Sequence, residues 1–451
     1  MIMSAKIDLV LRSQNVMTDI GARPASIAIA DGKVVTIGSF DQKYECTNDY
    51  TSEKFLLPGV VDSHVHINEP GRTEWEGFAS ATKAAAAGGV TTVIDMPLNS
   101  IPPTVNVAAL ATKKEAATGK CSVDVGFWGG SIPGNVADLK PLLDQGVFGF
   151  KCFLLHSGVD EFPASSLDDL ADALNVLSAE QALMVVHAEN SQAIQRSTKP
   201  SSRDYSEFLA SRPKGAENVA IAELIEEARR TKARVHVLHL SSGDSLSLIK
   251  SAREDGINIT VETCPHYLSL TAEEIADGAT QYKCCPPIRE KKNQEELWRG
   301  LTDGIIDQIV SDHSPCTADL KLFDKGDFQA AWGGISSLQL GLSIIWTQAL
   351  ERGIPLYKVV QWMSANPAYL VGLKDKGSIA VGKDADIIEF DPDASFSVDP
   401  RELFHKNQVT PYQGKILKGV VKQTWLRGNS VYKDGAHVGG VQGKFLTRGV
   451  N

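Results

Sequence analysis

Two histidines one residue apart, His64 and His66, follow a short apolar run in the stretch "GVVDSHVHINEPG". Side chains at positions i and i+2 leave the same face of a strand, so these two imidazoles point in the same direction. Two imidazoles in that arrangement can bind one divalent cation. The alternative is a hydrogen-bonded pair of histidines at a strand end, and the pair alone does not decide between the two readings.

Three further polar residues, His187, His239 and Asp312, end apolar runs later in the chain. His187 could also be a buried core histidine, and Asp312 could be the N-cap of the segment that follows it. His236 competes with His239, but residues three positions apart face opposite sides of a strand. Because His239 lies nearer the C-terminal end of its run, we expect it to be the ligand and His236 to pack against a helix.

Lys151 lies inside the apolar run "VFGFKCFLL", where a charged ammonium group is costly. Burial lowers the pKa of a lysine and favours a neutral, nucleophilic amine. Such an amine can react with carbon dioxide to give a carbamate, which is a carboxylate on a long arm that can bridge two metal ions. The alternative is a lysine paired with an acidic side chain.

These residues fall on a series of eight apolar runs separated by amphipathic helical patterns such as "NVAIAELIEEARRTK". Strands that alternate with helices predict a parallel sheet, and eight of them over about 300 residues fit a (β/α)₈ barrel. The alternative is an open doubly wound sheet, but the glycine-rich turn typical of that fold does not follow the first run. The runs are 58–66, 89–96, 122–128, 146–153, 182–189, 233–240, 257–264 and 306–313.

Barrel enzymes build their active sites at the C-terminal ends of the strands. The six candidates would therefore meet at one mouth of one barrel. Four imidazoles, a bridging carbamate and a carboxylate match a binuclear metal site, in which two ions about 3.5–4 Å apart can hold a hydroxide and polarise a carbonyl. The ligand set suits two Zn²⁺ ions, with Co²⁺, Mn²⁺ or Fe²⁺ as alternatives, and carbon dioxide would modify Lys151.

The pattern of apolar runs and turns at both ends of the chain differs from the pattern in the middle. Short apolar runs alternate there with Asp-Gly and Gly turns, which is the pattern of antiparallel strands. We therefore predict a small β-sandwich domain built from residues 1–56 and 374–451, around a barrel of residues 57–373.

Together these residues resemble the cyclic amidohydrolases of the amidohydrolase superfamily, which include dihydroorotases, hydantoinases (dihydropyrimidinases) and allantoinases. The resemblance covers nearly the whole chain and includes "LPGVVDSHVH", "GFKCF", "VHAEN", "LHLSS", "ETCPHYL", "CPPIR", "SDHSP" and "GSIAVGKDADI". It implies that His64, His66, Lys151, His187, His239 and Asp312 are the metal ligands, with Lys151 carboxylated and Asp312 also the general base. It further implies a homotetramer.

Within the family, several strings look like those of allantoinases: "NEPGRTEWEGF", "MPLNSIPPTV", "SDHSPCTADLK" and "AWGGISSLQ". Dihydroorotases usually carry an arginine where this chain has Asn68. Hydantoinases typically have a tyrosine where it has His156 and a serine where it has Cys285. The resemblance therefore implies opening of the hydantoin ring of allantoin to allantoate, in purine catabolism, with His156, Cys285, Gly333 and Gly334 as substrate contacts. A hydantoinase remains the alternative, and a non-catalytic scaffold homologue would lack some of the six ligands.

Composition excludes other classes of function. The 451 residues carry a net charge of −10 and no run of five basic residues, so we expect no nucleic-acid partner. No apolar stretch approaches the ~18 residues that span a bilayer, and the N-terminus lacks the apolar segment of a signal peptide. Seven irregularly spaced cysteines form no disulfide framework. These features predict a soluble, cytoplasmic protein without a membrane partner.

Overall fold

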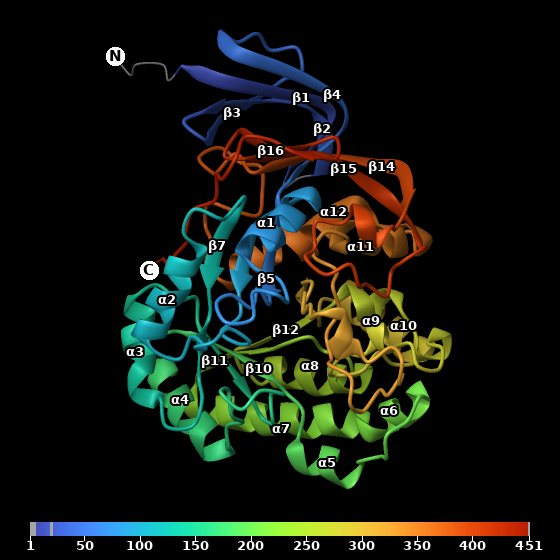
Figure 1. Ribbon diagram of the computed structural model, residues 1–451. Coiled ribbons are helices and arrows are strands. Elements are labelled where there is room, and N and C mark those ends of the chain that lie inside the picture. The colour runs from blue at the N-terminus through green and yellow to red at the C-terminus, as the bar shows by residue number, and fades with distance from the viewer. Residues whose placement is uncertain (1–5, 19–20, 450–451) are drawn as a thin grey trace.

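A long sheet built from both ends of the chain lies at one end of the molecule, and helices with parallel strands from the middle of the chain make up the rest (Figure 1). The structure is a computed structural model that describes residues 6–18 and 21–449. Within those residues, no helix has both the length and the apolar character needed to cross a membrane.

The terminal sheet has eight strands, and its centre is the pairing of β14 with β4. In spatial order the strands are β17 (Ala436–His437), β16 (Asn429–Lys433), β15 (Ile416–Leu426), β14 (Ile387–Ser397), β4 (Cys46–Pro58), β1 (Ile7–Thr18), β2 (Gly21–Ala30) and β3 (Lys33–Gly38). Residues from the two ends of the chain therefore share one sheet, with Ile387 opposite Pro58.

The expected antiparallel pairing holds for most neighbours in this sheet but not for all. β1 pairs with β2, and β2 with β3, in antiparallel fashion. β1 and β4, however, are parallel, with Leu9 opposite Asn48. The reason is topological: β2 and β3 form a hairpin on one side of β1, and the chain then crosses over to add β4 on the other side.

The middle of the chain forms parallel strands in two connected groups. One group has the order β5 (Val60–Val65), β6 (Val90–Asp95), β7 (Asp124–Phe127). The other has the order β8 (Gly129–Gly130), β9 (Phe150–Phe153), β10 (Leu183–His187), β11 (Arg234–Val237), β12 (Ile259–Thr263), β13 (Gln308–Ile309). Each of the eight apolar runs contains one of these strands. Nearly all of their residues are buried, as expected for parallel strands covered on both faces.

The first and last parallel strands are also linked. Val65, which ends β5, forms a parallel bridge with His313, and the backbone N–H of His66 donates to the His313 carbonyl at 2.8 Å. The ends of β5 and β13 therefore lie side by side, although about 250 residues separate them in sequence.

Helices connect most of these strands and pack around them (Figure 1). They are α1 (Phe78–Ala87), α2 (Val107–Ala117), α3 (Val136–Asp144), α4 (Leu167–Ala179), α5 (Ser191–Arg196), α6 (Tyr205–Ser211), α7 (Lys214–Thr231), α8 (Leu246–Glu254), α9 (Pro265–Ser269), α10 (Lys291–Thr302), α11 (Gly341–Glu351), α12 (Leu356–Val360) and α13 (Asn366–Leu370). Local sequence sets their ends: α4 begins with a capping box, in which Ser166 and Asp169 bond each other's backbone N–H.

A buried ion cluster joins the parallel strands to the terminal sheet. The Lys376 ammonium, 3% exposed, lies 2.6 Å from Asp124 of β7, 2.6 Å from Asp386 and 2.8 Å from Asp384. The Arg427 guanidinium also contacts Asp124. Three acidic side chains that could otherwise hold a cation are therefore occupied by lysine and arginine.

Candidate metal centre

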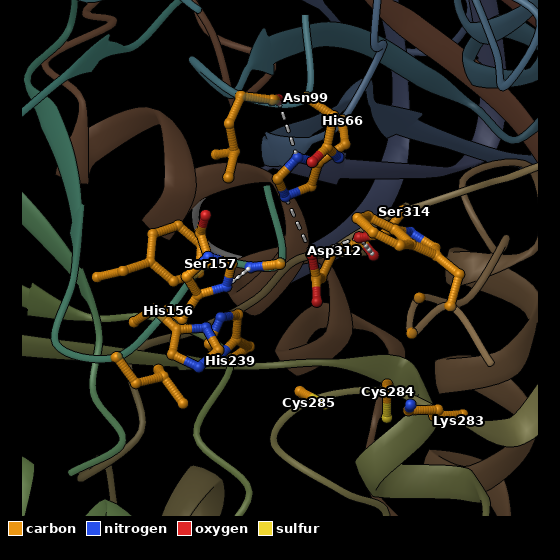
Figure 2. Close-up of a pocket in the computed structure, with 18 of the residues that line it drawn as sticks. His66, Asn99, His156, Ser157, His239, Lys283, Cys284, Cys285, Asp312 and Ser314 are labelled. Carbon is orange, nitrogen blue, oxygen red and sulfur yellow. Dashed lines mark hydrogen bonds and ion pairs between the residues drawn. The ribbon is translucent and has the colours of Figure 1, made fainter. Parts of the chain in front are cut away.

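The structure brings all six predicted ligands together at the C-terminal ends of the parallel strands. None of the six is more than 8% exposed. Five of them border a cavity of about 290 Å³, and His64 lies behind these with no exposed surface. Figure 2 shows His66, His239 and Asp312 around one space, with Cys285 across from His66. The strands place them as follows: His64 and His66 at the end of β5, Lys151 in β9, His187 at the end of β10, His239 after β11, and Asp312 after β13.

The potential ligand atoms lie within a few ångströms of one another. One Asp312 carboxylate oxygen is 3.2 Å from His64 Nε2 and 3.6 Å from His66 Nε2. Lys151 Nζ is 3.4 Å from each of the same two imidazole nitrogens. The rings of His187 and His239 are 4.6 Å apart, and ligand atoms of His64, His239 and Asp312 all lie within 4.8 Å of one another.

Acidic groups and a carbonyl oxygen orient three of the histidines from behind. His64 Nδ1 is 2.5 Å from a Glu262 carboxylate oxygen, and His187 Nε2 is 2.8 Å from Glu189. His66 Nδ1 is 3.2 Å from the Leu98 carbonyl oxygen. In His64 and His66 the second nitrogen, Nε2, faces Lys151 and Asp312 inside the site, which is how ligand histidines in metalloproteins are usually held.

Burial dominates the electrostatics of the site. It lowers the pKa of His187 and lowers the pKa values of His66 and His239 well below the usual range for histidine. It also lowers the pKa of Lys151 to about 8. These shifts favour neutral imidazoles and a neutral amine, which are the forms that bind metals and react with carbon dioxide.

The carboxylates behind the histidines are ionised in spite of their burial. Burial opposes ionisation of Glu189, but Arg212 and His187 lower its pKa to about 2. Burial likewise opposes ionisation of Glu262, but His64 and His236 hold its pKa below the usual range. Both groups therefore offer negative charge to the rings that they orient.

The donor set fits a divalent metal. His239 Nδ1 is buried and has no hydrogen-bond partner among the residues that the structure describes. Such an orphaned nitrogen is costly unless a ligand satisfies it. The imidazoles of the four histidines and the adjacent Asp312 carboxylate provide the nitrogen and oxygen ligands that zinc and similar ions prefer.

Backbone strain is concentrated at the same place. His239 and Asp312 have φ values of 37° and 44°, and Asn68, just beyond His66, has a φ of 66°. Non-glycine residues seldom adopt this left-handed region, and where they do the surrounding fold imposes it. The chain turns sharply where it leaves β11 and β13, and these turns direct the side chains of the two candidate ligands His239 and Asp312.

The four residues expected to contact substrate also border the cavity: His156, Cys285, Gly333 and Gly334. His156 is the most exposed of them, with 64% of its side chain accessible, and its Nδ1 accepts a hydrogen bond from the Gly158 N–H. Gly334 has a φ of 133°, and a Cβ there would lie 2.2 Å from the Ser314 carbonyl oxygen. Only glycine fits this turn, which holds the backbone against the cavity wall.

The expectation that His236 packs against a helix was wrong. Its two ring nitrogens instead lie 2.8 Å from Thr260 and 3.0 Å from Glu262, both on β12. The argument from alternating faces fails because β11 ends at Val237 and His239 is in the left-handed region, so the alternation does not extend to it.

Sequence reasoning missed the residues that support the ligands. Glu262 contacts both His64 and His236, and Glu189 contacts both His187 and Arg212. A signal was present, since each of these carboxylates lies in a buried strand run or directly after one, where an unpaired charge would be costly. Arg212 also lines the cavity, from the segment between α6 and α7.

Comparison with known proteins decides the family. A model of the Amidohydrolase family matches residues 55–431. The chain belongs to the amidohydrolase family. It is 54% identical to an allantoinase from Streptomyces avermitilis, over 95% of this chain and 96% of that protein, and 48% identical to an allantoinase from Saccharomyces cerevisiae, over 90% and 88%.

Solved structures of other amidohydrolases share the fold. The L-hydantoinase (dihydropyrimidinase) from Arthrobacter aurescens superimposes with a TM-score of 0.93 at 30% identity, covering 98% of this chain and all of that one. A dihydropyrimidinase from Brevibacillus agri gives a TM-score of 0.87, also at 30% identity, over 97% of this chain and 98% of that chain. The family likeness therefore includes the terminal sheet as well as the parallel strands.

Proposed function

We propose that this amidohydrolase opens the hydantoin ring of allantoin to give allantoate. The observation that carries the proposal is the 54% identity to an allantoinase over 95% of the chain. The buried cluster of four histidines, a lysine and an aspartate provides a site in which a ring amide can be hydrolysed. Allantoin is neutral, which agrees with Asn68 where a dihydroorotase usually has an arginine.

The parallel strands are proposed to close into the eight-position barrel that the sequence predicts. β7 and β8 are separated only by Trp128, and they count as one position. The bridge between Val65 and His313 joins the first position to the last. This closure supports a single mouth at which all six ligands meet.

The six residues His64, His66, Lys151, His187, His239 and Asp312 would hold two divalent ions, with zinc as the proposed metal. When bound, such ions polarise a carbonyl oxygen and lower the pKa of a water molecule. Lys151 would take part as a carbamate, and its pKa of about 8, set by burial, leaves a useful fraction of neutral amine near neutral pH.

Asp312 is the proposed general base. Its carboxylate lies 3.2 Å from His64 Nε2 and borders the cavity, so it can reach a water molecule that approaches a substrate held there. It would accept the proton of the attacking water and return it to the departing ring nitrogen, acting first as base and then as acid. Glu262 and Glu189 keep the histidines oriented throughout.

A hydantoinase is the second candidate, because the superimposed structures include hydantoinases. Two positions on the cavity wall argue against it: His156 and Cys285 stand where hydantoinases typically carry tyrosine and serine. Homotetrameric assembly and a cytoplasmic location stay predictions from the sequence.

The test combines metal analysis with substrate comparison on the purified protein. We expect about two metal ions per chain by elemental analysis, and the highest kcat/KM for allantoin among allantoin, hydantoin, dihydrouracil and dihydroorotate. Chelator-treated protein should lose turnover and regain it with metal and bicarbonate. Preference for hydantoin or dihydrouracil would refute the substrate assignment, and full activity without metal would refute the site.

A further inference from the structure

One wall of the cavity is a short loop, residues 329–334, which we name the recognition loop. Four of its residues border the cavity: Ala331, Trp332, Gly333 and Gly334. It has no regular secondary structure of its own apart from a turn at its start. Its shape must therefore be set by contacts with other parts of the chain.

Lys283 holds the first half of this loop. Its ammonium donates to the carbonyl oxygens of Gln329 at 2.9 Å and Ala331 at 2.6 Å. Its own backbone carbonyl accepts a hydrogen bond from the Gly334 N–H at 2.8 Å. Lys283 lies beside Cys284 at the edge of the cavity (Figure 2) and is 7% exposed.

Lys321 holds the second half in the same way. Its ammonium donates to the carbonyl oxygens of Trp332 at 3.0 Å and Gly334 at 2.7 Å. Lys321 is the last residue of a 3₁₀ turn, Ala318–Lys321. In the same turn, the Leu320 carbonyl oxygen accepts a hydrogen bond from the Trp332 N–H. Lys321 is 3% exposed.

These two lysines differ from the buried lysines Lys113 and Lys376 in what they contact. Lys113 is paired with Asp95, and Lys376 with three aspartates. In residues 6–18 and 21–449, by contrast, neither Lys283 nor Lys321 comes within ion-pair distance of a carboxylate. Burying an ammonium group without a counter-ion is costly, so carbonyl groups of the recognition loop must supply the compensating interactions.

The two ammonium groups hold the loop on both sides of Gly333. The carbonyls of residues 329, 331, 332 and 334 are all taken by the two ammonium groups. The N–H and C=O of Gly333 have no hydrogen-bond partner within the described part of the chain, and Gly333 borders the cavity. A free N–H beside a free C=O is complementary to an amide or urea group.

We propose that Lys283 and Lys321 are positioning residues that fix the recognition loop so that the N–H and the C=O of Gly333 are presented to the substrate. Their ammonium groups donate to carbonyl oxygens of the loop, and through these bonds they position it. The inference deepens the proposed function, on which it rests, because the amide ring and the ureido arm of allantoin offer the matching donors and acceptors. Lys321 ends the string "SDHSPCTADLK", which resembles allantoinases. Lys283 lies two residues before "CPPIR", which resembles the wider family.

The test uses Lys283→Met and Lys321→Met in the full-length, metal-loaded enzyme. Lys114→Met is the matched control, because Lys114 also donates to a backbone carbonyl, that of Gln145, but on α2. Each loop variant should raise KM for allantoin about tenfold or more, with kcat changed by less than about threefold. Hydrogen exchange of residues 329–334 should become faster, while metal content and exchange in β10 stay unchanged.

The outcomes separate this inference from the proposed function. Low turnover of allantoin by the unmodified enzyme would refute the function, whereas the exchange measurement still tests the lysines. Unchanged KM and unchanged loop exchange would overturn the inference, as would loss of metal together with kcat. If either methionine variant does not fold, Lys283→Gln or Lys321→Gln retains N–H donors and should give a smaller rise in KM.

Discussion

Replacing Lys376 by methionine removes the cation that three aspartates share. Two of these aspartates keep another partner: Asp124 retains the Arg427 guanidinium, and Asp384 retains Lys33. Asp386 loses the one ion pair that the described residues give it, and it is 5% exposed. Breaking a buried pair costs about 3–5 kcal/mol, so we expect the free energy of unfolding to fall by about 3 kcal/mol, near the lower end.

Lys33→Met is the matched control, because Lys33 contacts the same Asp384 at the same distance of 2.8 Å but is 39% exposed. An exposed ion pair contributes about 0–1 kcal/mol, so this variant should unfold close to the wild type. Urea unfolding followed by far-UV circular dichroism and by tryptophan fluorescence would compare all three proteins. Coincidence of the two signals would justify a two-state treatment. Equal midpoints for the two variants would refute the reasoning.

The pH dependence of the stability difference between the wild type and Lys376→Met provides a second check on the role of Lys376. Burial alone lowers the pKa of Lys376, but Asp386, Asp124 and Asp384 raise it above the ordinary value of 10.5. A raised pKa in the folded state means that the stabilisation is fully present below 10.5 and is lost as the pH rises through the folded-state value. The difference in free energy of unfolding between the wild type and Lys376→Met should therefore stay constant from about pH 7 to 10. It should become smaller only above that range.

Three further changes test the site itself. Asp312→Asn should keep the bound metal but reduce kcat roughly a hundredfold or more, and near-wild-type turnover would contradict its role as base. Lys151→Ala should lose metal and activity together and recover part of both with propionate, whereas full metal content without any additive would count against the carbamate. Gly334→Ala, whose Cβ would lie 2.2 Å from the Ser314 carbonyl oxygen, should raise KM for allantoin and lower Tm. A wild-type KM would exclude that turn from substrate binding.

The positions of the parallel strands could be predicted from the sequence because their signal is local. A buried strand such as Leu183–His187 is a short apolar run ended by a polar residue, and each of the eight runs contains a strand. The parallel pairing of β1 with β4 could not be predicted, because turn residues specify a hairpin but not the side on which a later strand joins the sheet.

The convergence of the six candidate ligands could be predicted, but the pairing of each histidine with its supporting carboxylate could not. His64 and Glu262 are 198 residues apart in sequence, and only the folded sheet brings them into contact. His236 was misassigned because one left-handed residue, His239, interrupts the alternation on which the argument relied. The contacts of Lys283 and Lys321 are with backbone carbonyls, which carry no signature in the residue types.

The bridge between Val65 and His313 has a consequence for how the protein is made. During synthesis, His66 leaves the ribosome long before Asp312 is translated, so no nascent chain shorter than 312 residues can contain all six proposed ligands. Strand β4 can pair with β14 only later in synthesis, since β14 begins at Ile387. Until β14 is made, one edge of β4 has no strand to pair with, and unpaired strand edges favour aggregation of incomplete chains.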